Sequence, residues 1–188
     1  MSTTEIDPDA VVYDLDGTLV RLAVNWNAVA REAATAFAEA GVDVDDADLW
    51  SLFETAPEHG LSADLEAIIA GHERRGAERS FRLPRADRLP DHGVPVGVCS
   101  LNAESACRRA LERHDLLDHV TTVVGRDSVR THKPDPEPLL TAVERLGASP
   151  DRALFVGDSE RDALTAERAG VPFEYVDTGR ERAAVGRS

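Results

Sequence analysis

Two carboxylates stand one residue apart, immediately after a short apolar run. Residues 11–13, Val-Val-Tyr, have the character of a buried strand, and Asp14 and Asp16 follow them. Gly17 marks the point where the chain must turn sharply away from that strand. Two acids at the end of a parallel strand repel each other unless a cation binds, and their oxygen atoms suit Mg²⁺. The pair therefore predicts a Mg²⁺ site in which one carboxylate is a nucleophile and its neighbour transfers a proton.

Polar residues also follow two later apolar runs. The run at 94–99 ends at Ser100, and a further run opens into Gly-Asp-Ser-Glu-Arg-Asp at 157–162. Lys133 precedes Pro134 in a predicted loop and is the only lysine among 21 basic residues, the others being arginines. An ammonium is a compact point charge, whereas a guanidinium is wide and planar. A single lysine in such a chain indicates a chemical requirement at that position.

Alternating strands and helices must position these residues. We expect strands at 11–13, 94–100, 120–124, 153–157 and 173–176. Helices are expected between them at 103–113, 136–146 and 160–169. This alternation predicts an α/β fold, a Rossmann-like doubly wound parallel sheet of about five strands. The carboxyl ends of its strands would bring the polar residues to one edge.

A helical segment interrupts this alternation. Apolar residues recur at helical spacing between the predicted N-cap Asn25 and the stop at Gly41, and two further helices are expected at 46–56 and 62–75. No strand pattern is visible between residues 21 and 88. We therefore expect a Rossmann-like core of residues 1–20 and 89–188 and a small helical cap inserted at 21–88. The alternative is one continuous domain in which these are ordinary crossover helices.

The composition is that of a globular chain with a strongly acidic balance. At 188 residues and a net charge of −14, the chain has room for one domain with a small insertion, and nucleic acid and anionic membranes would repel it. It contains no apolar run long enough to span a bilayer and no signal peptide, so we expect a cytoplasmic monomer or dimer. Cys99 and Cys107 are expected as buried thiols and not as a disulfide. High acidity with a single lysine resembles the composition of proteins from salt-loving cells.

The order of these motifs resembles the haloacid dehalogenase (HAD) superfamily of phosphohydrolases, in its capped branch. The resemblance rests on DLDGTLV at 14–20, Ser100, Lys133 and GDSERD at 157–162, and it extends from residue 11 to 176. It implies Mg²⁺-dependent hydrolysis of a small phosphomonoester through an aspartyl-phosphate intermediate. Phosphoglycolate phosphatases are the members of the superfamily that the chain most suggests.

The resemblance also implies which residues perform the reaction. Asp14 would be the nucleophile, and Asp16 would protonate the leaving alcohol and later deprotonate the attacking water. Asp14, the Asp16 carbonyl and Asp158 would bind the metal. Asp162, four residues after Asp158, would orient the metal shell or its water.

A second group would bind the phosphate. Ser100 and the Leu101 amide would contact its oxygen atoms. Lys133 would neutralise the charge that the phosphate shares with Asp14, as both a catalytic and a phosphate-binding residue. Thr18 is a further expected phosphate-binding residue that supports the nucleophile loop.

Two departures from the family pattern concern the substrate end of the site. Arg21 and Leu22 stand where many capped relatives have an acidic residue, and Leu101 follows Ser100 where relatives often have Asn. A dehalogenase is disfavoured because Asp16 occupies the acid position that it lacks, and a phosphonatase because 21–88 contains no lysine for a Schiff base. A phosphomutase of the β-phosphoglucomutase type and a non-catalytic HAD-like binding module stay open.

Within the predicted cap, Trp26 and Phe37 occur at helical spacing and are expected in its apolar core. His132, beside Lys133, is expected away from the site. A second anionic group on the substrate could pair with arginines in or near the cap, namely Arg21, Arg74, Arg75, Arg79 and Arg82.

Overall fold

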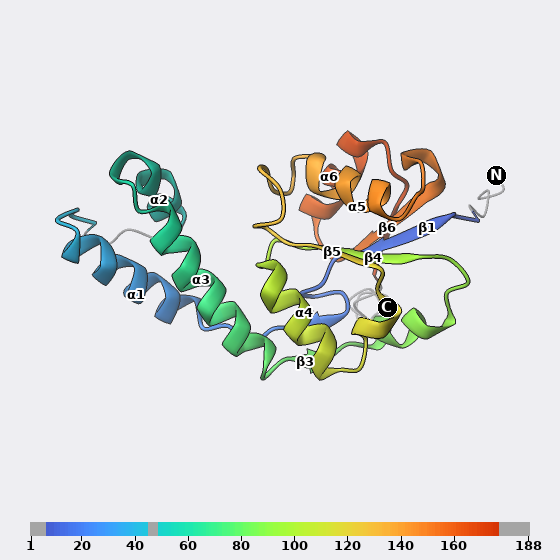
Figure 1. The fold of residues 1–188 in the computed structure, drawn as a ribbon, viewed down its shortest axis with the longest axis horizontal. Helices are drawn as coiled ribbons and strands as arrows, with labels where there is room; N and C mark the ends of the chain where they lie inside the picture. Colours follow the sequence, from blue (N-terminus) through green and yellow to red (C-terminus); the bar gives the residue numbers. More distant parts are fainter. Residues whose placement is uncertain (1–6, 45–48, 177–188) are drawn as a thin grey trace, which may run out of the picture.

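The computed structural model describes residues 7–44 and 49–176 of the chain. A five-stranded sheet lies at its centre in the order β5-β4-β1-β6-β7, and every neighbouring pair is parallel (Figure 1). The strands are β1 (Ala10–Tyr13), β4 (Val96–Cys99), β5 (Thr122–Val124), β6 (Ala153–Gly157) and β7 (Phe173–Tyr175). The predicted doubly wound α/β sheet of about five strands is confirmed.

Helices cover both faces of this sheet. On one face lies α4 (Glu104–Arg113), and on the other lie α5 (Glu137–Arg145) and α6 (Glu160–Ala169) (Figure 1). The central strand β1 serves both layers because its side chains alternate: Val11 and Tyr13 pack in the cluster of α4, and Val12 packs in the cluster of α5 and α6. Strands buried on both faces read as continuous apolar runs, which is the pattern seen in the sequence.

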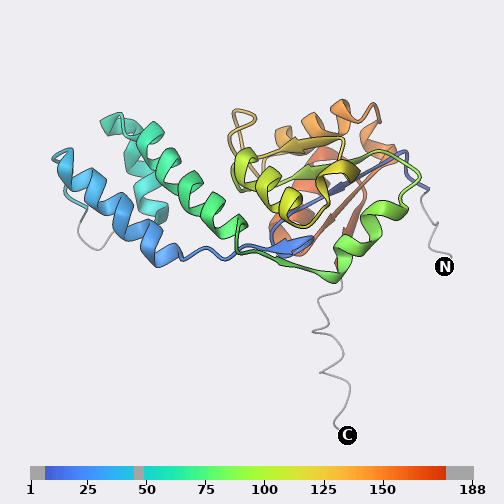
Figure 2. The ribbon, with the colours of Figure 1, turned by 60° about the horizontal axis from the view of Figure 1, so that its bottom comes forward.

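Three helices between β1 and β4 form a separate helical insertion. They are α1 (Trp26–Glu39), α2 (Leu49–Thr55) and α3 (Ser62–Ala77), with a 3₁₀ turn at Ala56–His59. Asn25 caps α1 as predicted, accepting a hydrogen bond from the Ala28 amide at 3.1 Å, and Gly41 follows the helix with φ +80°. Figure 2 shows the insertion beside the sheet, with α3 returning toward α4. It has its own apolar cluster, which includes Phe37, Leu52 and Ile69.

A short antiparallel pair of strands joins the insertion to the core. The strands β2 (Val20–Arg21) and β3 (Phe81–Arg82) are antiparallel, with Val20 opposite Arg82. The structure therefore forms strands between residues 21 and 88, where the sequence shows no strand pattern. A strand of two residues is too short to produce an alternating pattern, so the sequence carries no signal for it.

Short 3₁₀ segments complete the described chain. They lie at Pro84–Asp91, Leu117–His119 and Pro150–Arg152. Within the first, Ala86 and Leu89 already pack in the apolar cluster of the core strands. The start of the helix expected at 46–56 and the polar tail after Thr178 lie outside the described residues.

Two expectations about the whole chain can be compared with this fold. In the described part of the chain, no helix combines the length and apolar character needed to cross a membrane. Cys99 and Cys107 are free and buried, as expected. Burial raises the pKa of the Cys99 thiol to about 12, which leaves it unreactive as a nucleophile at neutral pH.

Candidate active site

A cleft of about 1180 Å³ lies at the carboxyl ends of the strands, with the helical insertion as its opposite wall. The core side carries most of the predicted residues: Asp14, Asp16, Ser100, Leu101, Lys133, Asp158 and Asp162. The insertion contributes Trp26 from α1 and Ile69 from α3. The parallel sheet has therefore brought together side chains that are up to 148 residues apart, from 14 to 162.

The Lys133 ammonium lies between two carboxylates of the cleft. Its Nζ donates to Asp14 Oδ1 at 2.7 Å and to Asp162 Oδ1 at 2.5 Å, and also to the Cys99 carbonyl at 3.2 Å. Lys133 is only 3 % exposed, so these charge-assisted hydrogen bonds are shielded from water. Burial alone would lower its pKa, but the carboxylates of Asp14 and Asp162 hold the pKa of Lys133 above its usual value. The lysine is a fixed cation at the predicted nucleophile.

Asp14 is buried directly after β1. Burial raises the pKa of Asp14 to about 7, the Lys133 ammonium opposes this rise, and the Asp162 carboxylate adds to it. Burial thus outweighs the Lys133 ammonium in setting the pKa of Asp14. A bound cation would lower this pKa and favour the ionised, nucleophilic form.

Asp16 points toward the start of the helical insertion. Its Oδ1 accepts a hydrogen bond from the Leu22 amide at 2.8 Å, one residue beyond β2. Burial raises the pKa of Asp16, and the Leu22 amide acts in the opposite direction. Asp16 lines the cleft while its orientation is set by the chain that leads into the insertion.

Three carboxylates could hold a metal ion. Asp14, Asp158 and Asp162 each offer one oxygen atom, and these atoms lie within 4.8 Å of one another. Burial raises the pKa of Asp158, and the nearby Asp162 adds to the rise. Three carboxylates share the one ammonium of Lys133, and their hard oxygen donors fit a divalent cation such as Mg²⁺.

Gly17 allows this close approach of two loops. It has φ +91°, and a Cβ atom at this position would lie 2.1 Å from Asp158 Oδ2. Any larger residue would displace Asp158 from the cluster, in addition to the strain of a positive φ. The glycine that follows the paired acids is therefore required by the site and not only by the turn.

The loop after β4 holds the expected phosphate ligands. Ser100 is buried at the cleft, where its hydroxyl donates to Asn102 Oδ1 at 3.1 Å and accepts from the Asn102 amide at 3.1 Å. Leu101 lines the cleft beside it. Thr18 lies elsewhere: it is fully buried, it does not line the cleft, and its Oγ1 has no hydrogen-bond partner among the described residues. Ser100 and Leu101 thus line the cleft, whereas Thr18 does not.

Several cleft residues were not identified from the sequence. Trp26 was expected in the apolar core of the cap, but it is 45 % exposed and lines the cleft. It is the first residue of α1 and precedes the apolar stripe that buries Phe37. Glu73 and Arg126 also line the cleft. The sequence does not distinguish them from other isolated charges in helices and turns, which are usually solvated. His132, expected away from the site, lines the cleft as well.

The five arginines that could pair with a second anionic group of the substrate differ in whether they line the cleft. Arg21 lines the cleft from β2. Arg82 pairs with Asp87 at 2.9 Å, and Arg74 donates to the Ser105 hydroxyl at 3.4 Å. Arg21 is thus the member of this group that is placed to contact a ligand.

Comparisons with known proteins agree with this geometry. Residues 86–176 match the family model of haloacid dehalogenase-like hydrolases. The phosphoglycolate phosphatase of Rhodospirillum rubrum is 34 % identical in an alignment 205 positions long, gaps included, that spans 95 % of this chain and 83 % of that protein. The phosphoglycolate phosphatase of Cereibacter sphaeroides (strain ATCC 17029) is 32 % identical in an alignment of 198 positions that spans 93 % of this chain and 88 % of that protein.

A solved structure shows the same architecture. The crystal structure of a HAD-superfamily hydrolase of subfamily IA, variant 1, from Geobacter sulfurreducens superposes with a TM-score of 0.60 at 28 % identity. The match covers 88 % of this chain and 88 % of that chain.

Proposed function

Because this chain belongs to the haloacid dehalogenase-like hydrolases and is a phosphatase of that family, we propose that it hydrolyses a small phosphomonoester with Mg²⁺ as its metal. The observation that carries this proposal is the ammonium of Lys133, held between Asp14 and Asp162 next to Asp158. Phosphoryl transfer requires a positioned nucleophile and fixed charges more than any other device. These four residues supply both.

In the proposed reaction, Asp14 attacks the phosphorus atom. The bond from phosphorus to the alcohol oxygen breaks as the bond to the carboxylate forms, which gives an aspartyl-phosphate. Lys133 lies 2.7 Å from Asp14 Oδ1 and stays beside the charge that the carboxylate and phosphoryl group share. Ser100 and the Leu101 amide would hold the phosphoryl oxygen atoms. Because the site is buried, these interactions are stronger than they would be in water.

Asp16 would then transfer two protons. It donates one to the leaving alcohol oxygen, and it accepts one from the water that cleaves the aspartyl-phosphate. Its hydrogen bond from the Leu22 amide orients the carboxyl group toward the insertion side of the cleft, where a leaving group would depart. Asp14 and Asp16 thus divide the nucleophilic and acid–base work.

Asp14, the carbonyl of Asp16 and Asp158 would hold the Mg²⁺. When bound, the ion would neutralise phosphoryl oxygen charge during the transfer. Asp162 is fixed from both sides, because its Oδ1 accepts from Lys133 and its Oδ2 accepts from the Ser159 hydroxyl at 2.6 Å. It would orient Lys133 and the metal shell together.

We propose a phosphorylated small acid, such as phosphoglycolate, as the substrate class. The similar proteins of R. rubrum and C. sphaeroides are phosphoglycolate phosphatases. Arg21 lines the cleft at the point where the insertion begins, and its guanidinium would pair with the second anionic group of such a substrate. The helical insertion, expected at 21–88, would act as a cap that excludes water while the phosphoryl group is transferred.

The test is a screen of phosphorylated metabolites, run with Mg²⁺ and again after exhaustive chelation. We expect release of inorganic phosphate from small phosphorylated acids, loss of turnover on chelation, and its return when Mg²⁺ is added. Undiminished turnover without metal would contradict the proposed metal. A product that keeps its phosphoryl group at a new position would instead indicate the phosphomutase alternative.

A further inference from the structure

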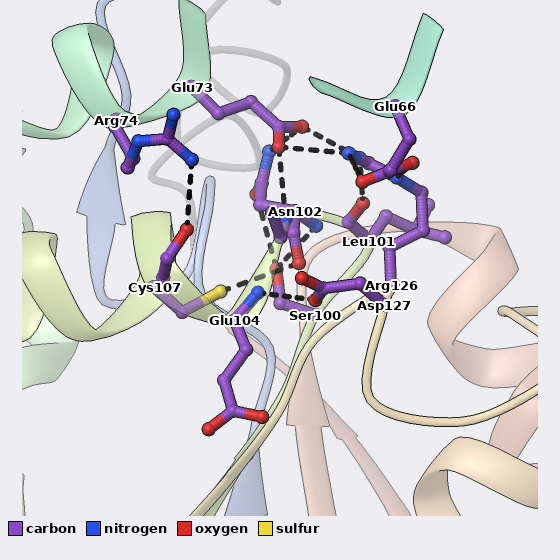
Figure 3. A network of polar contacts seen from close by, with 12 residues as sticks. Glu66, Glu73, Arg74, Ser100, Leu101, Asn102, Glu104, Cys107, Arg126 and Asp127 are labelled. Carbon is purple, nitrogen blue, oxygen red and sulfur yellow. Dashed lines mark hydrogen bonds and ion pairs between the residues drawn. The ribbon is translucent and has the colours of Figure 1, made fainter. Parts of the chain in front are cut away.

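Glu73 is a charged residue that is fully buried where the helical insertion meets the core. It lies on α3, and its Oε1 accepts hydrogen bonds from Asn102 Nδ2 at 3.0 Å and from Arg126 at 2.8 Å. Its Oε2 accepts from the Ala103 amide at 2.9 Å and from a second Arg126 nitrogen at 3.1 Å. Figure 3 shows Asn102 and Arg126 directed at Glu73 from the core side. Four donors satisfy one carboxylate across this boundary.

The partners of Glu73 belong to, or hold, the loop that carries the expected phosphate ligands. Two hydrogen bonds of 3.1 Å join Asn102 to Ser100. The side-chain Oδ1 of Asn102 accepts from the Ser100 hydroxyl, and the backbone N–H of Asn102 donates to it. Arg126 donates to the Leu101 carbonyl at 2.7 Å (Figure 3). Glu73 is therefore linked to Ser100 through Asn102 and to Leu101 through Arg126.

Stability alone does not account for this arrangement. Burying an ion pair costs desolvation that offsets most of the attraction, so such a pair is weak support for a fold. The insertion and the core already share apolar contacts, since Ala77 of α3 packs in the core cluster. What a fully satisfied buried network supplies is one fixed orientation of the groups it connects.

We propose that Glu73 is a positioning residue for phosphate binding. It holds Asn102, the Ala103 amide and Arg126 in the arrangement that places Ser100 Oγ and the Leu101 amide beside the substrate phosphoryl group, to which the Ser100 proton turns from Asn102 Oδ1 on binding. This inference rests on the proposed phosphatase site, in which Ser100 and Leu101 contact the phosphate. Because Glu73 comes from the insertion, the phosphate loop of the core depends on how α3 is docked.

Glu66 offers a matched control for Glu73. It lies seven residues earlier on α3 and carries the same charge, and its two oxygen atoms accept from Arg126 at 3.0 and 2.7 Å. Glu66→Gln removes one carboxylate from Arg126 but leaves the contacts of Glu73 with Asn102 and Ala103 in place. Glu73→Gln removes the same charge and disturbs the loop as well.

The experiment compares both variants with wild type in turnover of a phosphomonoester and in inhibition by inorganic phosphate. A displacement of about 1 Å at a reacting group can cost roughly 100-fold in rate. For Glu73→Gln we expect kcat/KM to fall by about 10- to 100-fold and the phosphate inhibition constant to rise about 10-fold. For Glu66→Gln we expect changes below about threefold, as for a charge that does not touch the loop.

Circular dichroism and thermal melting would show whether each variant is folded. If Glu73→Gln does not fold, Asn102→Ala tests the same link, because it removes the side-chain bridge from Glu73 to Ser100 while Glu73 keeps Arg126 and the backbone amide of residue 102 keeps its bond to Ser100. It should weaken phosphate inhibition to a similar extent. A change in melting temperature alone, without a change in phosphate inhibition, would mean a merely structural role.

Two results would overturn the positioning role. One is a folded Glu73→Gln or Asn102→Ala with the wild-type phosphate inhibition constant, and the other is an equal loss in Glu66→Gln and Glu73→Gln. Failure of the proposed function would look different, because the wild-type protein itself would then hydrolyse no phosphomonoester.

Discussion

The edge of the sheet and the helical insertion line the same cleft, but they place their side chains there in different ways. On the sheet edge, Asp14, Ser100 and Asp158 each follow a buried parallel strand, so the backbone delivers them to one place. In the insertion, Trp26 and Glu73 reach the cleft only because α1 and α3 pack in a particular way. The cleft residues of the sheet edge thus depend on local chain geometry, whereas those of the insertion depend on tertiary docking. Substitutions in the two regions should therefore have different kinetic signatures.

The largest effect is expected at the sheet edge from Asp14→Asn. An amide cannot act as the nucleophile, so turnover should fall by roughly 10⁴- to 10⁶-fold while the protein stays folded. Asp9→Asn is a matched control, because Asp9 forms an exposed pair with Arg152 away from the cleft. Mass spectrometry of the phosphoenzyme trapped during turnover checks the assignment. Phosphate on a residue other than Asp14 would refute it.

A smaller but still large loss is expected from Lys133→Ala. Removing one well-placed charge from a shielded site costs about 2.7–4 kcal/mol of transition-state stabilisation, a rate loss of roughly 10² to 10³. Lys133→Arg should fall between alanine and wild type, because a guanidinium cannot occupy the compact position between Asp14 and Asp162. Steady-state kinetics with saturating Mg²⁺ measures both variants. Wild-type turnover in the arginine variant would show that any cation suffices.

The smallest effect, and the one that separates the two regions, is expected from Arg21→Gln at the start of the insertion. KM for a phosphorylated acid should rise about 10-fold, as for loss of one charge-assisted contact, with kcat little changed. KM for a phosphomonoester whose alcohol part carries no charge, such as phenyl phosphate, should not change. Arg82→Gln is the control, since Arg82 lies in the same two-stranded β2–β3 pair and forms an ion pair with Asp87. Equal changes for both substrates would remove Arg21 from substrate selection.

The same contrast explains what could be predicted from the sequence. Asp14 and Ser100 directly follow strands, Lys133 is the only lysine of the chain, and the apolar run of a buried strand is visible in a single sequence. The sheet therefore followed from pattern alone, and so did the set of side chains at its edge. The N-cap at Asn25 and the stop at Gly41 were local signals of the same kind.

The remaining features depend on contacts that leave no local pattern. Glu73 has the sequence context of an exposed helical glutamate, and only the docking of α3 shows that it is buried. Relatives often have asparagine directly after the residue that corresponds to Ser100, and this chain has Leu101 there. Asn102 comes one residue later, and its side chain still accepts a hydrogen bond from the Ser100 hydroxyl. Trp26 looked like a core residue because spacing cannot show which end of a helix faces a cleft.

The antiparallel pairing of β2 with β3 has a consequence for how this fold can change. The chain leaves the core through Val20 and returns through Arg82, and these two residues are direct partners in one antiparallel pair. The sheet therefore has the same two attachment points whatever length of chain joins them, and the entropy of closing that loop rises only slowly with its length. An insertion attached in this way can change in length between two fixed ends, provided that a residue in the place of Glu73 still docks on the loop of Ser100.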